Sequence, residues 1–349
     1  MRQILTAHLS TDGKETSVES GVSLRRPVLH FLNPLSNAFA GSERRTINYL
    51  ALLSSRSNLT LWAEKEPHRE LAGLPFHRLD PVGGILPQGG TLVLVGIYVD
   101  RIHWLERARP DRLIIVYNTP ALVRLRELLD FASRAGLPRP ELVFPSETHR
   151  ASTGLPGFVD WGLFDFETFK PTQRIRDSGR FTVGRMSRDE NIKHHPQDIR
   201  LYRRLAKRGV RVRLMGASVF RERLQDCEAI EFLDTGQVAA SAFLNGLDAF
   251  VYRVHPMWSE PSGRVVVEAM ACELPVVVGR GGGYCELIEH GVNGFLFDTH
   301  AEAEEYVEEL RRDPILARRV GRAARATVLG RFGQAHADRV GDFFLRRPS

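Results

Sequence analysis

Residues 259–278 read SEPSGRVVVEAMACELPVVV, and this stretch decides the fold class. An apolar segment from about Gly263 to Cys272 predicts a helix packed in the protein interior. The run Pro275–Val278 follows at once and predicts a buried strand, and a similar run, Ala249–Tyr252, precedes the stretch. A strand, a helix and a second strand in this order are typical of a parallel sheet covered by helices.

The same alternation runs along the chain in two series, which predicts two doubly wound, Rossmann-like domains that face each other across a cleft. Predicted strands of the first series are Val28–Leu32, Leu59–Trp62, Leu92–Ile97, Leu113–Tyr117 and Leu142–Phe144, with helices over Ser42–Ser54 and Ala121–Ala135. The second series begins at Phe181 and continues with Val210–Met215, Ile230–Phe232, Ala249–Tyr252, Pro275–Val278 and Phe295–Phe297. Open sheets of this class bind ligands at the carboxyl ends of their strands.

The chain divides by composition into five segments. We expect a flexible tail at 1–26, a first domain at 27–160, a connector at 161–173, a second domain at 174–330 and a helical end at 331–349. The length of 349 residues suits two domains of ordinary size. A run around Glu302–Arg312 carries charges of both signs, and we interpret it as a solvated amphipathic helix.

Composition and charge exclude several classes of protein. The hydrophobic share of 43% and charged share of 26% are those of a globular protein, and apolar runs are too short to span a membrane. With no apolar signal core near the N-terminus, we expect a cytoplasmic protein, and Cys227, Cys272 and Cys285 are expected to be free thiols. The net charge of +6 leaves two alternatives open: a basic cleft for a phosphorylated ligand, or peripheral contact with the anionic inner face of the membrane. No nucleic-acid-binding module is recognisable, so nucleic acid is not an expected partner.

The start of the helix in the opening stretch has the chemistry of an anion site. Ser262 is a good N-cap residue, and Gly263 lets a ligand approach the backbone closely. The unpaired N–H groups of a helix start favour an anion. Glu268 lies in the apolar helix, where a carboxylate needs a partner.

Glu260 and Glu268 are separated by seven residues, and the surrounding text resembles the EX7E element of retaining GT-B glycosyltransferases, especially glycosyltransferase family 4. Residues 281–297, GGGYCELIEHGVNGFLF, are similar to the Gly-Gly-x-x-Glu loop of that family and its following hairpin. Residues 181–188, FTVGRMSR, resemble the strand and loop that open its donor domain. Residues 164–171 resemble its interdomain connector, while 145–147 and 40–44 match more loosely.

The resemblance implies a role for individual residues. Arg185 and Lys193 bind the pyrophosphate of the donor, Glu260 lies near the transferred sugar, and Glu268 accepts hydrogen bonds from the ribose hydroxyls. Catalysis thus falls to Arg185, Lys193 and Glu260, and the donor-binding residues are Gly41, Ser262, Gly263, Arg264, Glu268, Gly282, Gly283 and Glu286. The first domain becomes the acceptor side, the second the nucleotide-sugar donor domain, and the last helix crosses back to the first domain. No metal and no cofactor are expected.

Some positions depart from the family pattern. Glu273 stands where the family usually has glycine, and Ser262 replaces a frequent phenylalanine. Many relatives carry a histidine where this chain has Tyr117-Asn118-Thr119. Adjacent His194 and His195 suggest a metal site, but no third ligand follows at a suitable spacing.

Two functions from different classes follow. The first is a retaining, metal-independent glycosyltransferase that moves a sugar from a nucleoside-diphosphate sugar to a glycan, lipid-linked or small-molecule acceptor. The alternative is a non-catalytic module that binds sugar nucleotides or glycans. The joint presence of Arg185, Lys193, Glu260 and Glu268 favours the enzyme.

Overall fold

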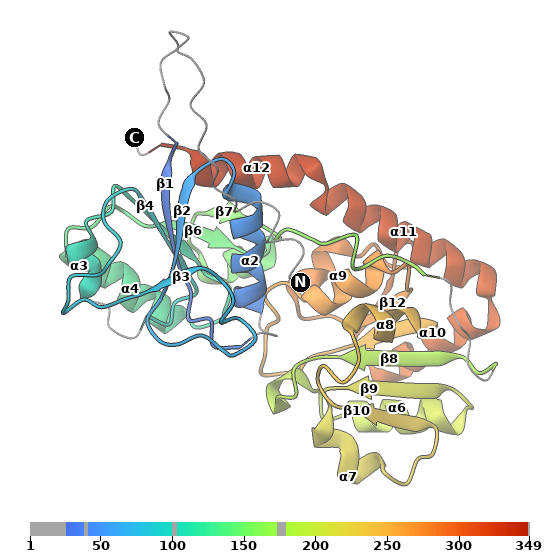
Figure 1. The fold of residues 1–349 in the computed structure, drawn as a ribbon. Helices are drawn as coiled ribbons and strands as arrows, with labels where there is room; N and C mark the ends of the chain where they lie inside the picture. The colour runs from blue at the N-terminus through green and yellow to red at the C-terminus, as the bar shows by residue number, and fades with distance from the viewer. Residues whose placement is uncertain (1–25, 38–40, 100–102, 173–178, 348–349) are drawn as a thin grey trace. The chain divides into compact units, whose positions relative to one another are not determined.

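The computed structural model describes residues 26–37, 41–99, 103–172 and 179–347, which form two α/β units (Figure 1). The first unit contains the described residues up to Phe144, the segment Pro156–Leu163 and the residues from Gln334 onward. The second contains Pro145–Leu155 and Phe164–Gly333. Each unit is therefore discontinuous in the sequence.

The first unit is built on a seven-stranded parallel sheet of order β3-β2-β1-β4-β5-β6-β7. Its strands are β1 (Val28–Leu32), β2 (Asn58–Ala63), β3 (Phe76–Arg78), β4 (Thr91–Val95), β5 (Arg112–Val116), β6 (Glu141–Phe144) and β7 (Phe158–Val159). Its helices are α2 (Gly41–Leu53), α3 (Trp104–Ala108), α4 (Leu122–Arg134) and α12 (Gln334–Leu345). Every residue of β4 and β5 is buried, as expected for central strands covered on both faces.

The second unit repeats this plan with a six-stranded parallel sheet of order β10-β9-β8-β11-β12-β13. Its strands are β8 (Thr182–Met186), β9 (Arg211–Met215), β10 (Ile230–Leu233), β11 (Ala249–Tyr252), β12 (Val276–Gly279) and β13 (Phe295–Phe297). Its helices are α5 (Glu147–Thr153), α6 (Asp198–Lys207), α7 (Arg221–Leu224), α8 (Ala240–Asn245), α9 (Arg264–Ala271), α10 (His300–Arg312) and α11 (Pro314–Phe332). The direction of winding reverses between β8 and β11, which is where such sheets bind ligands.

The predicted class, α/β with two doubly wound sheets, is confirmed. Each predicted strand is present within a few residues of its expected bounds. The edge strands β3 and β7 were not predicted, because segments of three and two residues carry too little apolar pattern to be recognised. No helix in the described part of the chain has the length and apolar character that crossing a membrane requires.

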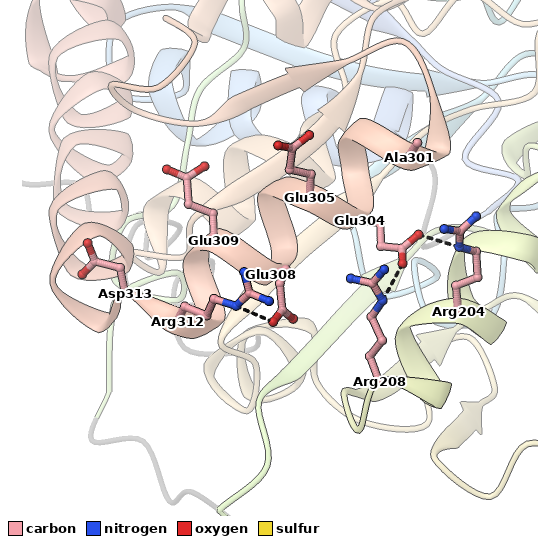
Figure 2. Close-up of a pocket in the computed structure, with 9 residues that line it drawn as sticks. All are labelled: Arg204, Arg208, Ala301, Glu304, Glu305, Glu308, Glu309, Arg312 and Asp313. Atoms are coloured by element: carbon pink, nitrogen blue, oxygen red, sulfur yellow. Dashed lines mark ion pairs between the residues drawn. The ribbon is translucent and has the colours of Figure 1, made fainter.

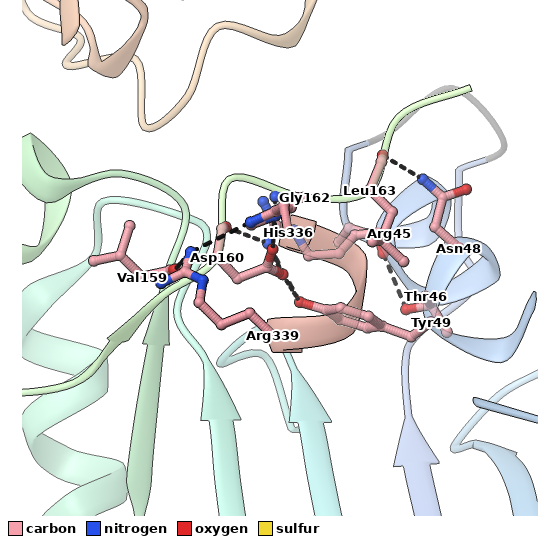
Figure 3. Close-up of polar contacts among 11 residues, drawn as sticks. Arg45, Thr46, Asn48, Tyr49, Val159, Asp160, Gly162, Leu163, His336 and Arg339 are labelled. Atoms are coloured by element: carbon pink, nitrogen blue, oxygen red, sulfur yellow. Dashed lines mark hydrogen bonds and ion pairs between the residues drawn. The ribbon is translucent and has the colours of Figure 1, made fainter. Parts of the chain in front are cut away.

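A buried carboxylate ties three segments of the first unit together (Figure 3). Asp160 is fully buried just after β7, and its side chain accepts hydrogen bonds from Arg45 at 2.8 Å and from the Tyr49 hydroxyl, both on α2. Nε2 of His336, on α12, lies 3.1 Å from the second carboxylate oxygen. Burial alone would raise the pKa of Asp160, but Arg45 and the bonds from His336 and Tyr49 outweigh it and lower the pKa to about 2. The last helix is thus fixed to the first unit by a charged, hydrogen-bonded network.

Helix α10 is less solvated than its sequence indicates. Glu304 is only 3% exposed, and its carboxylate pairs with Nε of Arg204 at 2.6 Å and Nε of Arg208 at 2.7 Å, both in the α6 region (Figure 2). These side chains line a pocket of about 470 Å³ between α6 and α10. The helix is amphipathic, and Glu304 lies on its packed face because the two arginines pair with its carboxylate.

The end of helix α9 explains the unusual residue at position 273. The N–H of Glu273 bonds to Met270 O at 3.1 Å and the N–H of Leu274 to Ala269 O at 3.1 Å, which is the Schellman arrangement. This ending places Glu273 in the left-handed region, with φ of 58°, where glycine is normally preferred. The chain therefore keeps a strained glutamate at a position that the fold makes suitable for glycine.

Replacing Glu273 by glycine should relieve that strain. A non-glycine residue in the left-handed region costs roughly 1–2 kcal/mol, so Glu273→Gly should raise the free energy of unfolding by about 1 kcal/mol after the entropy cost of glycine. Glu273→Ala retains a Cβ and is the matched control, expected to show no such gain. Urea unfolding of the three proteins measures the difference, and equal stability of the glycine and alanine variants would contradict the interpretation.

Candidate active site

The predicted site residues of the second unit gather around the carboxyl ends of β8 and β11. Arg185 lies in β8, and Lys193 ends a short 3-10 turn in the following loop. Glu260 lies in the loop between β11 and α9, and Glu268 lies on α9. This is the point where the winding of the sheet reverses.

Arg185 is fully buried and organises the loops around it. Its Nη2 donates to Lys193 O at 2.6 Å and its Nη1 to Arg253 O at 3.3 Å. Its guanidinium also lies 5.1 Å from the Tyr252 ring centroid and 3.7 Å from Asp198 Oδ2. In this structure Arg185 therefore positions the backbone of Lys193, and its predicted contact with the donor pyrophosphate stays a prediction.

A second arginine shares the buried carboxylate of Asp198. Arg253 Nε lies 3.0 Å and Nη2 2.5 Å from Asp198 Oδ1. Burial raises the pKa of Asp198, while Arg253 and Arg185 oppose this shift. Two guanidiniums around one carboxylate leave a net positive charge beneath the site.

Lys193 and Glu260, predicted from separate motifs, are in direct contact. Lys193 Nζ lies 2.7 Å from Glu260 Oε2, which also accepts a hydrogen bond from Tyr252 Oη at 3.2 Å. The same ammonium lies 4.6 Å from the Trp258 ring centroid. Because Lys193 is only 7% exposed, these groups replace much of the water that a surface lysine would have.

Helix α9 begins one residue later than predicted. The N-cap is Gly263 and not Ser262, because the chain enters the helix in a left-handed conformation, φ 70°, that favours glycine. A Cβ at this position would also lie 2.3 Å from the Tyr284 ring. No side chain caps the helix, so the N–H groups of its first turn suit an anion.

Two predicted donor-binding residues pair with each other on the first turns of α9. Arg264 Nε lies 3.0 Å from Glu268 Oε1, an i to i+4 pair, and the Arg264 guanidinium lies 5.5 Å from the ring centroid of Phe164. A carboxylate in an apolar helix needs a partner, and for Glu268 this partner is Arg264, one turn earlier.

The glycines of the 281–283 turn pack against the Glu260 loop. Gly283 N donates to Glu260 O at 2.8 Å, and Gly282 forms a bridge with Glu260. An added Cβ would lie 2.4 Å from the Tyr284 ring at position 282 and 2.3 Å from Pro261 O at position 283. This packing accounts for both glycines, and their contact with the donor stays a prediction.

The remaining predicted residues have other surroundings. The carboxylate of Glu286 accepts hydrogen bonds from the backbone N–H groups of Glu147, at 3.2 Å, and Thr148, so it caps α5. Gly41 is the first residue of α2 and belongs to the first unit, and its role at the donor stays a prediction.

Several residues at the site were not predicted. Ser146, Asp198, Tyr252 and Arg253 are all buried there. A serine followed by glutamate is a signature of a helix start and could have identified Ser146 as a cap. The buried Asp198–Arg253 pair joins residues 55 positions apart, and no local pattern signals such a contact.

The histidines of the site are neutral near pH 7. Burial and the charge of Arg185 lower the pKa of His194 to about 3, and burial, Arg253 and His255 lower that of His195 to about 4. Burial also lowers the pKa of His149 to about 4, against the opposing effect of Glu260. Among the residues that the structure describes, no three His, Cys, Asp or Glu side chains are grouped to hold a metal ion.

Most of the second unit is similar to a known protein family. Residues 167–327 match the family model described as glycosyl transferases group 1. The matched segment contains Arg185, Lys193, Glu260 and Glu268.

Individual proteins resemble short segments of the chain in sequence. A segment of 73 residues is 44% identical to D-inositol 3-phosphate glycosyltransferase of Pseudarthrobacter chlorophenolicus, and covers 20% of this chain and 17% of that protein. A segment of 46 residues is 48% identical to a probable sucrose-phosphate synthase of Thermosipho melanesiensis, and covers 13% of this chain and 11% of that protein. These alignments therefore span less than a fifth of either relative.

Solved structures resemble nearly the whole chain. Anabaena HepE in complex with UDP-glucose gives a TM-score of 0.70 at 20% identity, covering 91% of this chain and 98% of that one. Sucrose-phosphate synthase of Thermosynechococcus elongatus gives a TM-score of 0.70 at 14% identity, with coverage of 91% and 98%. At this identity the likeness establishes the shared two-domain α/β fold.

The neutral histidine beside Arg185 should make the protein sensitive to acid. The pKa of His194 is about 3 in the native protein and about 6.5 in an unfolded chain. Between these values only the unfolded chain binds the proton, so stability falls as the pH decreases from 6.5.

Protonation linked to His194 should lower the free energy of unfolding by up to about 1.4 kcal/mol for each pH unit below 6.5. His194→Gln removes the titrating group and should flatten the decline in the free energy of unfolding between pH 6.5 and pH 4.5. Chemical denaturation at several pH values compares the slopes, and identical slopes for the two proteins would show that His194 is not the group responsible.

Proposed function

We propose that the protein is a glycosyltransferase that transfers a sugar from a nucleoside-diphosphate sugar with retention of anomeric configuration and without a metal ion. The observation that carries the proposal is the contact between Lys193 and Glu260 at 2.7 Å, beside the uncapped start of α9. A cation and a helix N-terminus can bind a diphosphate, and a carboxylate can accept hydrogen bonds from the hydroxyl groups of the attached sugar.

The donor is proposed to lie along α9. Glu268, at the second turn of the helix, would accept hydrogen bonds from the ribose hydroxyls, as the resemblance to the EX7E element of family 4 implies. The diphosphate would lie at the first turn, near the backbone of Ser262–Arg264 and the ammonium of Lys193. UDP-sugars are the first donors to test, because the similar HepE structure contains UDP-glucose.

The chemistry follows from the charges. The bond between the anomeric carbon and the phosphate oxygen breaks, a bond to the acceptor oxygen forms, and the acceptor proton passes to the leaving phosphate. Negative charge increases on the diphosphate, and a fixed cation in a poorly hydrated site stabilises it. Lys193 is such a cation, because its position is set by Arg185 through the Lys193 carbonyl.

Lys193 forms an ion pair with Glu260, with 2.7 Å between Nζ and Oε2. We propose that the donor phosphate takes over the ammonium and that Glu260 then accepts hydrogen bonds from the sugar. Tyr252, whose hydroxyl bonds to Glu260 at 3.2 Å, would hold the carboxylate in place during this exchange. The proposed acceptor is a glycan, a lipid-linked molecule or a small molecule. We also propose peripheral contact with an anionic membrane, on the basis of the net charge of +6.

The second candidate function is a non-catalytic module that binds sugar nucleotides. Release of nucleoside diphosphate from a panel of UDP-, GDP- and ADP-sugars separates the two candidates, because a binding module would bind a donor without consuming it. Release that continues in the presence of EDTA would support the metal-independent mechanism. Loss of turnover on chelation, restored by one divalent ion, would overturn it.

The ammonium of Lys193 should be essential for turnover. Removing one preorganised charge-stabilising group typically lowers kcat by about 10²–10³-fold, and we expect a loss of that size in Lys193→Ala. Lys170→Ala is the matched control, because Lys170 is exposed and pairs with Glu167 in the same unit. Steady-state release of nucleoside diphosphate is the measurement, and a Lys193→Ala enzyme within threefold of the control would exclude the proposed role.

A further inference from the structure

Three segments that are far apart in the sequence meet at the hydroxyl of Ser146. Ser146 follows β6 and is fully buried in the second unit. The other two segments are the loop that carries Glu260 and Pro261, and the glycine turn around Gly283.

The hydroxyl of Ser146 makes two hydrogen bonds at once. It accepts from His149 N at 3.0 Å, which caps helix α5, and it donates to Pro261 O at 2.6 Å. The first bond stabilises a helix start, as serine N-caps do. The second reaches the backbone of the residue that directly follows Glu260, and capping does not require it.

The glycine turn packs against this bond. A Cβ added at Gly283 would lie 2.3 Å from Pro261 O and 2.6 Å from Ser146 Oγ. Gly283 N also donates to Glu260 O at 2.8 Å. The carbonyl groups of both Glu260 and Pro261 are therefore held by neighbouring segments, and the space beside them is filled.

A further contact closes the arrangement. Glu286, three residues after Gly283, accepts hydrogen bonds from the backbone N–H groups of Glu147 and Thr148. The start of α5 is thus joined to the glycine turn by a carboxylate and to the Glu260 loop by a hydroxyl. The side chain of His149 is 3% exposed on α5; burial lowers its pKa to about 4, and the charge of Glu260 opposes this shift.

We propose that Ser146 is a positioning residue that fixes the backbone of Glu260 and Pro261 and so aims the Glu260 carboxylate at the donor sugar. The inference rests on the proposed function. A displacement of about 1 Å at a reacting group can lower the rate by as much as about 10²-fold. Loss of the hydroxyl should therefore affect turnover beyond its effect on stability.

The test compares two serine variants with a matched capping variant. Ser146→Ala removes both hydrogen bonds. Ser146→Gly removes the bond to Pro261 but retains most of the capping stability, because glycine is tolerated at an N-cap. Thr299 is the N-cap of α10, and its side chain accepts a hydrogen bond from Glu302 N at 3.2 Å. Thr299→Ala removes this cap, and Thr299 is not one of the site residues.

Release of nucleoside diphosphate, binding of the free nucleoside diphosphate and thermal unfolding are measured for all four proteins. We expect kcat to fall about tenfold or more in both Ser146 variants, while Kd for the free nucleoside diphosphate stays within about twofold. Thr299→Ala should lower Tm through the loss of its cap, with kcat unchanged. If Ser146→Ala does not fold, Ser146→Gly is compared with Thr299→Ala and the wild-type protein in its place.

A kcat of Ser146→Gly equal to that of the wild-type enzyme would overturn the inference and leave the proposed function intact. Equal losses of kcat in Ser146→Ala and Thr299→Ala would likewise show a merely structural role. A wild-type protein that releases no nucleoside diphosphate from any donor of the panel would instead overturn the proposed function itself.

Discussion

The buried guanidinium of Arg185 is the constraint on which the candidate site of the second unit depends. Removing a charged side chain from water is costly unless hydrogen bonds and opposite charge compensate it. Here the compensation comes from two backbone carbonyls, those of Lys193 and Arg253, and from the nearby carboxylate of Asp198. Each carbonyl belongs to a loop that leaves the carboxyl end of a strand, so satisfying one buried charge fixes both loops.

The positions of Lys193 and Glu260 are set by contacts with neighbouring segments. Lys193 reaches Glu260 because Arg185 holds its carbonyl, and Glu260 is held from the opposite side by Gly283 and the Ser146 bond to Pro261. Helix α9, which carries Glu268, is bounded by residues in the left-handed conformation at both ends, Gly263 and Glu273. A short helix with two fixed ends presents its first turn and its carboxylate with little freedom to rotate or shift.

Much of this arrangement was predictable from the sequence. Apolar runs separated by helical patterns identified both doubly wound sheets, because buried parallel strands have continuous hydrophobic sequences. The apolar segment from about Gly263 to Cys272 located α9. The resemblance to a known family assigned Glu260 and Glu268, together with Arg185 and Lys193, to one site. These features are local in sequence, or follow from the order of motifs along the chain.

The features that were missed depend on contacts between distant segments. The choice of Gly263 over Ser262 as N-cap follows from the closeness of the Tyr284 ring, which no residue near position 263 signals. The burial of Arg185 and the pair between Asp198 and Arg253 arise only when α6, β8 and β11 are packed together. The burial of Glu304 has the same origin, since its arginine partners come from a helix about a hundred residues earlier.

The proposed function places the nucleotide of the donor along α9 of the second unit, with Glu268 on the ribose. Calorimetric titration of UDP, GDP and ADP onto the wild-type protein and Glu268→Ala tests it most directly, with Glu289→Ala, an exposed glutamate of the same unit, as control. A hydrogen bond to a charged group contributes about 1.5–3 kcal/mol, so Glu268→Ala should bind the preferred nucleotide at least about tenfold more weakly, while the control is unchanged. A folded Glu268→Ala protein with the wild-type Kd would contradict it.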